Sequence, residues 1–142
     1  DGANIEIMEE VGNDNIFIFG LSANEVMEKK QAGYQPRDLY TQNLELREVL
    51  DMVRKGFFSG PQGNLFQPIL ENLLDHGDPY MVLADFQPFC DIQEEIGKAY
   101  LDSDAWIRKS IINVSRMGKF SSDRSIKEYA DNIWNIPVNP KK

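Results

Sequence analysis

The chain has 142 residues, which suits a single domain or part of one, and a chain of this length buries roughly 70% of its unfolded surface. The formal net charge is −8 and no cluster of basic residues occurs. We therefore exclude a nucleic-acid or anionic-membrane surface, because phosphate contacts require grouped Lys and Arg side chains. The single cysteine, Cys90, excludes an internal disulfide and is compatible with a reducing cytosol. No apolar run is long enough to span a membrane or to act as a secretion signal.

The first segment predicts a short helix followed by a buried strand. The helix is expected to end at Gly12, the usual position for a glycine after a helix. Ile16 to Phe19 is then a run of large apolar residues bounded by Gly20. A run this short, apolar on both alternating faces, is typical of a strand between the layers of a parallel α/β sheet. Because few partner strands are evident, we expect the rest of the sheet to lie in polypeptide outside this sequence.

The remaining chain is mostly helical by its patterning. Ser22, followed three residues later by Glu25, predicts a capping box, and Asp85, Asp102 and Ser121 are expected to cap later helices. The segment from Tyr80 to Ala84 fits a strand or an extended loop equally well. We expect about seven helices in all, at approximately 5–12, 22–33, 44–56, 65–76, 86–96, 102–118 and 123–134.

Few residues are candidates for catalysis. A Cys-His nucleophile pair would have to consist of His76 and Cys90, which lie 14 residues apart with no flanking motif. The alternative is a structural thiol on an apolar helix face and an imidazole in a surface loop. One His and one Cys are too few to close a zinc site of nitrogen and sulfur ligands.

The carboxylates offer a second set of candidates, namely Glu9-Glu10, Glu94-Glu95 and Asp102 with Asp104. Adjacent acids on a helix point to different faces. We therefore interpret them as a solvated face and as charges at helix starts, and general acid/base catalysis is the alternative.

The segment from Gly118 to Arg124 is the third candidate. A helix start with two hydroxyls, flanked by Lys119 and Arg124, has the groups needed to hold an anion. The alternative is an ordinary cap in which Asp123 compensates the helix dipole and Arg124 pairs with an acid elsewhere. The sequence contains no Gly-rich phosphate loop of either standard pattern.

Blocks spread along the whole chain resemble the α-glucan phosphorylases, which act on glycogen, starch and maltodextrin. They occur in the order that this family has. The blocks are Asp1-Gly2-Ala3-Asn4 with Phe17-Ile18-Phe19-Gly20, Gly56-Phe57-Phe58-Ser59, Tyr80-Met81-Val82-Leu83-Ala84-Asp85-Phe86, Trp106-Ile107-Arg108 and Gly118-Lys119-Phe120-Ser121-Ser122-Asp123-Arg124-Ser125-Ile126. The resemblance covers essentially all of this chain but only the last sixth or so of a full-length member, so we interpret the chain as a C-terminal fragment.

The resemblance implies an α/β fold. Members are glycosyltransferases of the GT-B type with two Rossmann-like domains that face a cleft. Residues 1–142 would then be the mostly helical C-terminal portion of the second, cofactor-binding domain, with the strand at 16–19 closing its sheet. The last helix, at about 123–134, is expected to cross back toward the N-terminal domain.

The resemblance also implies an activity for the full-length enzyme. Members release terminal α-1,4-linked glucose as glucose 1-phosphate, using orthophosphate and pyridoxal phosphate, and the intact enzyme is expected to be a cytoplasmic homodimer. The family's Gly-rich loop and its cofactor-carrying lysine precede Asp1, so we expect no catalytic, cofactor-binding or metal-binding residue in this chain. None of its lysines lies in that cofactor motif: Lys29, Lys30, Lys55, Lys98, Lys109, Lys119, Lys127, Lys141 and Lys142.

The chain alone is therefore expected to be an inactive structural wall whose main partner is the remainder of the enzyme. A hypothesis from another class is a free-standing, acidic, helical binding module that shares only pieces with the phosphorylases.

Overall fold

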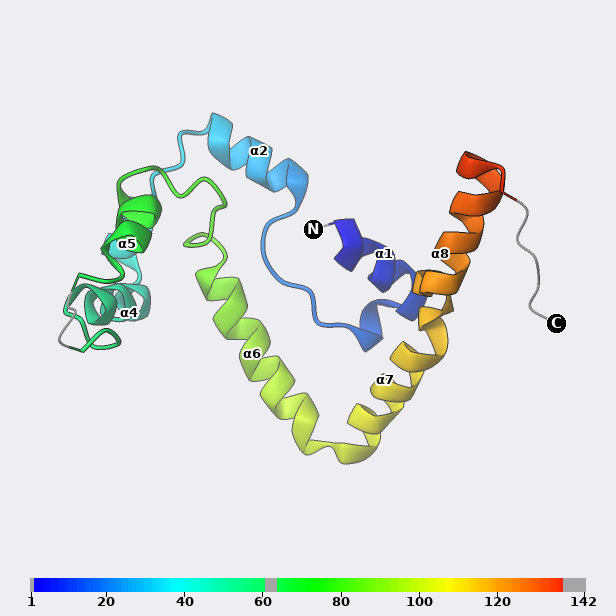
Figure 1. Ribbon diagram of the computed structural model, residues 1–142. Coiled ribbons are helices and arrows are strands. Elements are labelled where there is room, and N and C mark those ends of the chain that lie inside the picture. Colours follow the sequence, from blue (N-terminus) through cyan, green and yellow to red (C-terminus); the bar gives the residue numbers. More distant parts are fainter. Residues whose placement is uncertain (1, 61–63, 137–142) are drawn as a thin grey trace. The chain divides into compact units, whose positions relative to one another are not determined.

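The computed structural model describes residues 2–60 and 64–136 (Figure 1). In these ranges the chain forms α-helices, short 3-10 or π-helical turns, and no strand. The α-helices are α1 (Gly2–Val11), α2 (Ala23–Gln31), α3 (Pro36–Gln42), α4 (Leu44–Arg54), α5 (Gln67–Leu74), α6 (Phe86–Leu101), α7 (Ser103–Arg116) and α8 (Ser122–Tyr129). The short turns are Asn13–Asn15, Met117–Phe120 and Ala130–Trp134.

The contacts divide the chain into two units. The first combines the described residues of Asp1–Ile18 and Glu95–Lys142, and the second is Phe19–Glu94. Each unit buries its own apolar residues.

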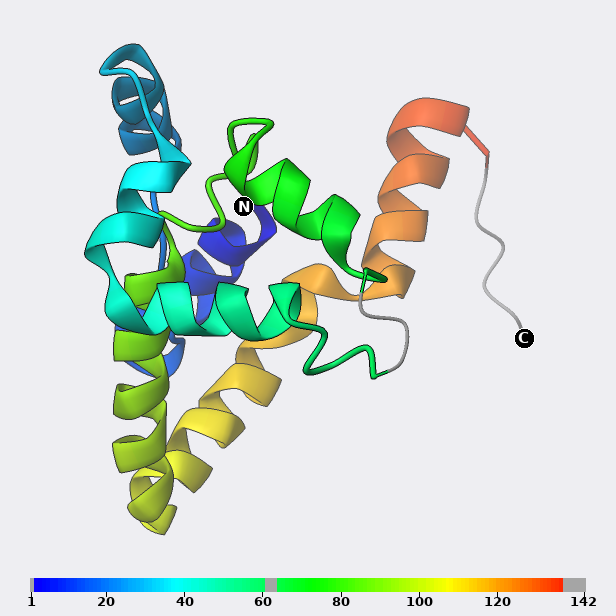
Figure 2. The ribbon, with the colours of Figure 1, turned by 90° about the vertical axis from the view of Figure 1, so that its left-hand side faces the viewer.

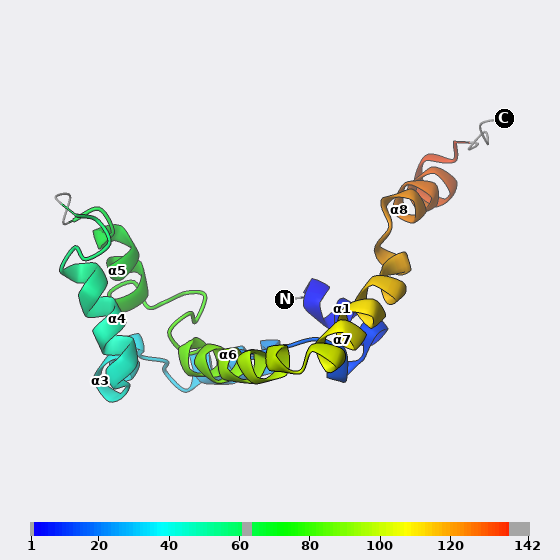
Figure 3. The same ribbon diagram turned by 90° about the horizontal axis from the view of Figure 1, so that it is seen from below.

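The second unit is built around a small leucine core. Helices α3, α4 and α5 pack against one another, and Figure 3 shows them grouped together. The core residues of α4 and α5 are spaced four apart, so one face of each helix turns inward. Each fully buried leucine contributes about 1.5–3 kcal/mol relative to exposure. The buried cluster consists of Leu46, Leu50, Leu70, Leu74 and Leu83.

Helix α2 belongs to the second unit but lies outside this core. Its predicted capping box is confirmed, because Glu25 N–H donates to Ser22 Oγ at 3.3 Å and Ser22 N–H donates to Glu25 Oε2 at 2.8 Å. None of the residues of α2 is buried. Local capping therefore defines where this helix starts, and core packing contributes little to its stability.

The first unit brings together segments from the two ends of the sequence. Helices α1 and α7 pack against each other, and Val11 at the end of α1 is fully buried. Helix α1 ends at Gly12, as predicted, and this residue has a left-handed φ of 86°. The carbonyl oxygen of Val11 accepts hydrogen bonds from Arg116 Nη1 at 3.1 Å and from Asn15 Nδ2 at 2.8 Å. These side-chain donors satisfy the Val11 carbonyl oxygen, because the backbone N–H of Asn15 donates to the Gly12 carbonyl oxygen instead.

The helix predicted over 123–134 is present. Helix α8 starts after Ser121, whose Oγ accepts from Arg124 N–H, and it continues into the π-helical turn at Ala130–Trp134. Figure 2 shows the two as one continuous orange-to-red rod. The caps predicted at Ser121 and Asp102 are confirmed, and the Asp102 carboxylate accepts from Ala105 N–H at 3.1 Å.

The prediction of an α/β fold with a clear buried strand at 16–19 is wrong. Ile16 has an extended backbone, with φ −141° and ψ 149°, but neither it nor the residues up to Phe19 form a strand. Ile18 is 38% exposed and Phe19 is 47% exposed. The physical reason is that a strand requires a hydrogen-bonded neighbour. In the described ranges no other extended segment supplies one, because residues 79–85 form turns. The expected number of helices fits, with α3 as a further short helix opened by Pro36.

No helix in the described ranges combines the length and the apolar character needed to cross a bilayer.

Candidate functional site

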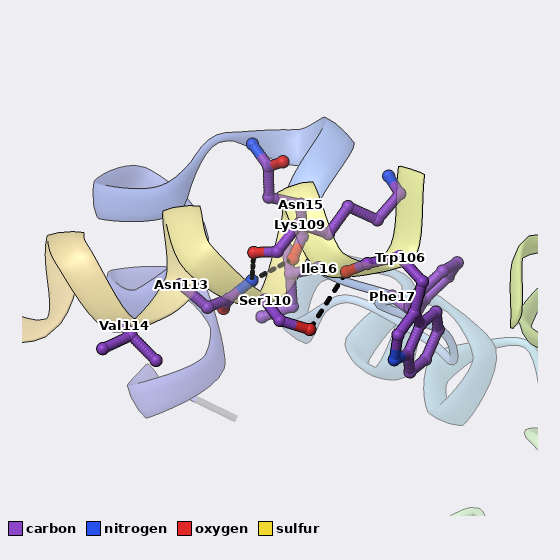
Figure 4. A pocket seen from close by; sticks show the side chains of 8 residues that line it. All are labelled: Asn15, Ile16, Phe17, Trp106, Lys109, Ser110, Asn113 and Val114. Carbon is purple, nitrogen blue, oxygen red and sulfur yellow. Dashed lines mark hydrogen bonds between the residues drawn. The ribbon is translucent and has the colours of Figure 1, made fainter. Parts of the chain in front are cut away.

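A hollow of about 490 Å³ lies on the first unit, between the segment that follows α1 and one face of α7 (Figure 4). Its wall is mainly apolar and aromatic. The lining residues are Asn15, Ile16, Phe17, Trp106, Lys109, Ser110, Asn113 and Val114.

Two local features of the sequence bring the lining residues together. The 3-10 turn at Asn13–Asn15 directs the following residues along α7. On α7 the lining residues recur at three- and four-residue spacing, so they share one helix face. Asn113 Nδ2 joins the two sides, donating to the Asn15 carbonyl oxygen at 2.6 Å and to the Lys109 carbonyl oxygen at 2.9 Å. Lys109 Nζ adds a second link by donating to the Asp14 carbonyl oxygen.

Aromatic rings form one end of the hollow. Figure 4 shows Phe17 and Trp106 side by side there, with ring centroids 6.2 Å apart and an interplanar angle of 24°. The rings of Tyr100 and Trp106 are nearly perpendicular, with centroids 5.2 Å apart, and Lys109 Nζ lies 5.6 Å from the centre of the Phe17 ring. Aromatic pairs contribute about 0.5–1.5 kcal/mol beyond their buried area. The rings therefore fix the segment that follows α1 against α7.

The polar groups of this wall are already paired within the chain. Ser110 Oγ donates to the Trp106 carbonyl oxygen at 3.0 Å, and Asn113 and Lys109 donate to backbone carbonyls. The residues that line the hollow include no carboxylate, imidazole or thiol. The nucleophile types in the lining are the Ser110 hydroxyl and the Lys109 amine, and both donate to backbone carbonyls with no carboxylate or imidazole base beside them in the lining. The chemistry that this wall supports is therefore the burial of apolar surface.

A family model described as carbohydrate phosphorylase matches residues 1–136. The chain belongs to the carbohydrate phosphorylase family. Among curated relatives, the glycogen phosphorylase of Synechocystis sp. is 52% identical over 136 residues, which cover 96% of this chain and 16% of that protein. The Bacillus subtilis glycogen phosphorylase is 45% identical over 137 residues, which cover 96% of this chain and 17% of the relative. The human liver form of glycogen phosphorylase is 41% identical over 142 residues, which cover 100% of this chain and 17% of that protein.

The phosphorylase chain thus spans about a sixth of the length of the curated relatives that it matches. The match is continuous from residue 1 to residue 136. That continuity is inconsistent with a chain that shares only pieces with the family.

His76 and Cys90 do not form a catalytic pair in this phosphorylase chain. His76 is exposed after α5, Cys90 is half-buried on α6, and no hydrogen bond in the described ranges joins them. Burial raises the pKa of the Cys90 thiol, and the nearby negative charges of Glu45, Asp91 and Glu94 raise it further. A raised pKa disfavours the thiolate, which is the nucleophilic form.

The candidate carboxylates have structural roles or lie in solvent. Glu10 accepts from Lys119 Nζ at 2.8 Å, which raises the pKa of Lys119 through the hydrogen bond and the opposite charge. Glu9 and Glu95 are exposed, and Asp102 caps α7. In the described part of the chain no group of three or more His, Cys, Asp or Glu side chains is arranged to hold a metal ion.

The candidate anion site at 118–124 has its cations paired. Lys119 pairs with Glu10, while Arg124 pairs with Glu128 and also donates to the Lys119 carbonyl oxygen. Ser121 accepts the backbone N–H of Arg124. This arrangement is the ordinary cap that the sequence offered as the alternative, with Arg124 paired to an acid.

One group that the sequence analysis missed is the buried carboxylate of Asp78, which is 1% exposed. It accepts hydrogen bonds from Tyr34 Oη at 2.9 Å, Val82 N–H at 3.0 Å and Leu83 N–H at 2.8 Å. Burial and then the Asp78 hydrogen bond raise the pKa of Tyr34. The available signal was an Asp in a Gly-Asp-Pro turn, because Asp side chains accept from backbone groups a few residues further on.

Proposed function

We propose that this chain is the C-terminal portion of the second domain of an α-glucan phosphorylase, and that it acts there as a structural wall. The observation that carries the proposal is the family match over residues 1–136. The lining of the hollow on the first unit supports the structural role, because Lys109, Ser110 and Asn113 donate to backbone carbonyls and no carboxylate, imidazole or thiol stands beside them.

The intact enzyme would transfer terminal α-1,4-linked glucose units of a polyglucan to orthophosphate and release glucose 1-phosphate. Such transfer depends on exact placement of groups, which a rigid wall supplies at a distance. We also propose that the intact enzyme is a cytoplasmic homodimer.

The family implies pyridoxal phosphate, and the residues that line the hollow do not fit that cofactor. Lys109 is the lysine that lines the hollow, but its Nζ donates to the Asp14 carbonyl oxygen and lies over the Phe17 ring. The hollow has no arginine, and no glycine-rich loop lines it to receive a phosphate group. We therefore assign the cofactor and its lysine to polypeptide outside this chain. When bound, the cofactor's phosphate would serve as the acid/base group.

The last helix has an apolar face that supports a domain contact. On α8 and the turn after it, Ile126 is 57% exposed, Ile133 is 61% exposed and Trp134 is 53% exposed. Tyr129 stacks on Trp134 with centroids 5.5 Å apart. Large exposed apolar groups on one helix mark an interaction surface. We assign this face to contact with the N-terminal domain of the whole enzyme.

The activity proposal is tested by measuring glucose 1-phosphate released from an α-1,4-glucan and orthophosphate. The whole enzyme is expected to be active, and this chain alone is expected to be inactive. Phosphorolysis by this chain alone would refute the wall role, and an inactive whole enzyme would refute the substrate class.

The domain contact is tested by Ile133→Asp in the whole enzyme. A buried, unpaired carboxylate at the contact is expected to destabilise the enzyme by about 1–3 kcal/mol. Asn132→Asp is the matched control, because it adds the same charge at the adjacent exposed residue. Equal melting temperatures for the two variants would contradict the contact.

A further inference from the structure

Helix α2 is flanked by two contacts that lead to the same turn. The turn comprises residues 78–85, the last part of the connection from α5 to α6. Its first residue, Asp78, and its last residue, Asp85, each present a carboxylate. One carboxylate bonds the chain just before α2 and the other bonds the chain just after it.

The contact before α2 involves Asp85. Leu21 N–H donates to Asp85 Oδ1 at 2.9 Å, across 64 positions of sequence. Gly20 has a φ of +87°, and a methyl group added there would lie 2.8 Å from Asp85 Oδ2. Only glycine allows this close approach without displacement of the carboxylate.

The contact after α2 involves Asp78. Tyr34 Oη donates to Asp78 Oδ2 at 2.9 Å, and the Val82 and Leu83 amides hold the same carboxylate inside the turn. The turn is strained, because Asp78 and Met81 have left-handed φ values of 47° and 55°. The carboxylate thus holds its own turn in shape while it binds Tyr34.

Between these two contacts, α2 has little support. None of its residues is buried, Met27 is 57% exposed, and the packed helices of the second unit are α3, α4 and α5. Its capping box is internal to the helix and attaches it to nothing else. Side chains of α2 therefore contribute little to its attachment.

We infer that Asp78 and Asp85 form a clasp that holds α2 to the rest of the second unit at two points, Leu21 before the helix and Tyr34 after it. Opening of the clasp releases α2 as a separate cooperative segment, while the leucine core of α4 and α5 stays folded. Segments with few buried contacts open at lower free energy than the core, which makes this separation physically reasonable. The inference does not depend on the proposed activity.

The experiment is native-state amide hydrogen exchange, read by mass spectrometry, on the intact polypeptide that carries this chain. Peptides over residues 23–31 report on α2, and peptides over residues 44–54 report on the core helix α4. Tyr34→Phe removes the hydroxyl donor to Asp78, and Asp85→Asn weakens the acceptor of Leu21. Each variant is expected to exchange at least about tenfold faster in α2, because each change removes or weakens a hydrogen bond to a charged carboxylate.

The matched control is Tyr40→Phe, which removes a tyrosine-to-aspartate hydrogen bond of the same 2.9 Å length, between Tyr40 and Asp51. This control is expected to leave α2 exchange unchanged. The clasp is supported if both test variants accelerate α2 about tenfold while α4 changes less than about threefold. Unchanged α2 exchange in either test variant, equal acceleration of α4, or equal acceleration of α2 by Tyr40→Phe would overturn it.

Discussion

Replacement of Phe19 by alanine tests how much of this chain's exposed apolar surface is covered in the whole enzyme. Truncation of a fully buried phenylalanine costs about 3–5 kcal/mol. In this chain Phe19 is 47% exposed and meets Phe89 edge-on at 5.5 Å. Because about half of the side chain is exposed, about half of that cost applies, so we expect Phe19→Ala to lower the unfolding free energy of this chain by roughly 2 kcal/mol. In the whole enzyme we expect about 3–5 kcal/mol, because the wall role requires the exposed half to be buried.

The assay is urea unfolding followed by circular dichroism, on the chain and on the whole enzyme, with the m-value checked for each variant. Phe57→Ala is the control, since Phe57 is 69% exposed and its ring meets only its neighbour Phe58 among the ring contacts of the described residues. Its expected cost is below about 1 kcal/mol in the chain. An equal cost of Phe19→Ala in both proteins would refute the covered-surface argument. Loss of turnover without loss of stability would refute the wall role.

Three further predictions concern individual side chains. The rate of Cys90 alkylation by iodoacetamide is expected to rise with pH, with a midpoint above the usual thiol pKa of 9.0, because burial and nearby acids raise the pKa of this thiol. A midpoint below 9.0 would contradict this prediction. Tyr34 has a pKa raised above its usual 10.0, so its stabilising contribution is complete below that pH and is lost as the pH rises through the raised value. The stability difference between wild type and Tyr34→Phe should therefore shrink above about pH 10 in urea titrations, and a constant difference would oppose the assignment. Gly20→Ala is expected to lower the unfolding free energy by about 1–3 kcal/mol more than Gly33→Ala. Both glycines have left-handed φ values, but only at Gly20 would the added methyl group collide with Asp85. Equal urea midpoints for the two variants would refute this collision.

Local features were predictable from the sequence. The capping box at Ser22, the caps at Asp102 and Ser121 and the helix end at Gly12 all depend on residues within a few positions of each other. Such interactions are complete within one helical turn, so the sequence pattern contains all the partners.

Features with distant partners were not predictable in the same way. The run at 16–19 has strand-like residues, but a strand also requires a neighbour, and none lies in the described residues. Asp85 precedes α6 as expected, but its carboxylate accepts a hydrogen bond from the Leu21 N–H, 64 residues earlier in the chain. The hollow on the first unit was missed because it joins residues 15–17 to residues 106–114. The family resemblance, in contrast, depended on short blocks and was sufficient to identify the family.

The discontinuous makeup of the first unit has a consequence for the order of folding. Its two segments are separated by all of Phe19–Glu94, so it can assemble only after that long loop has closed. The second unit is contiguous and can form from nearby contacts as soon as its own residues are available. During synthesis the leucine core should therefore form early, and α1 should wait for α7 to leave the ribosome.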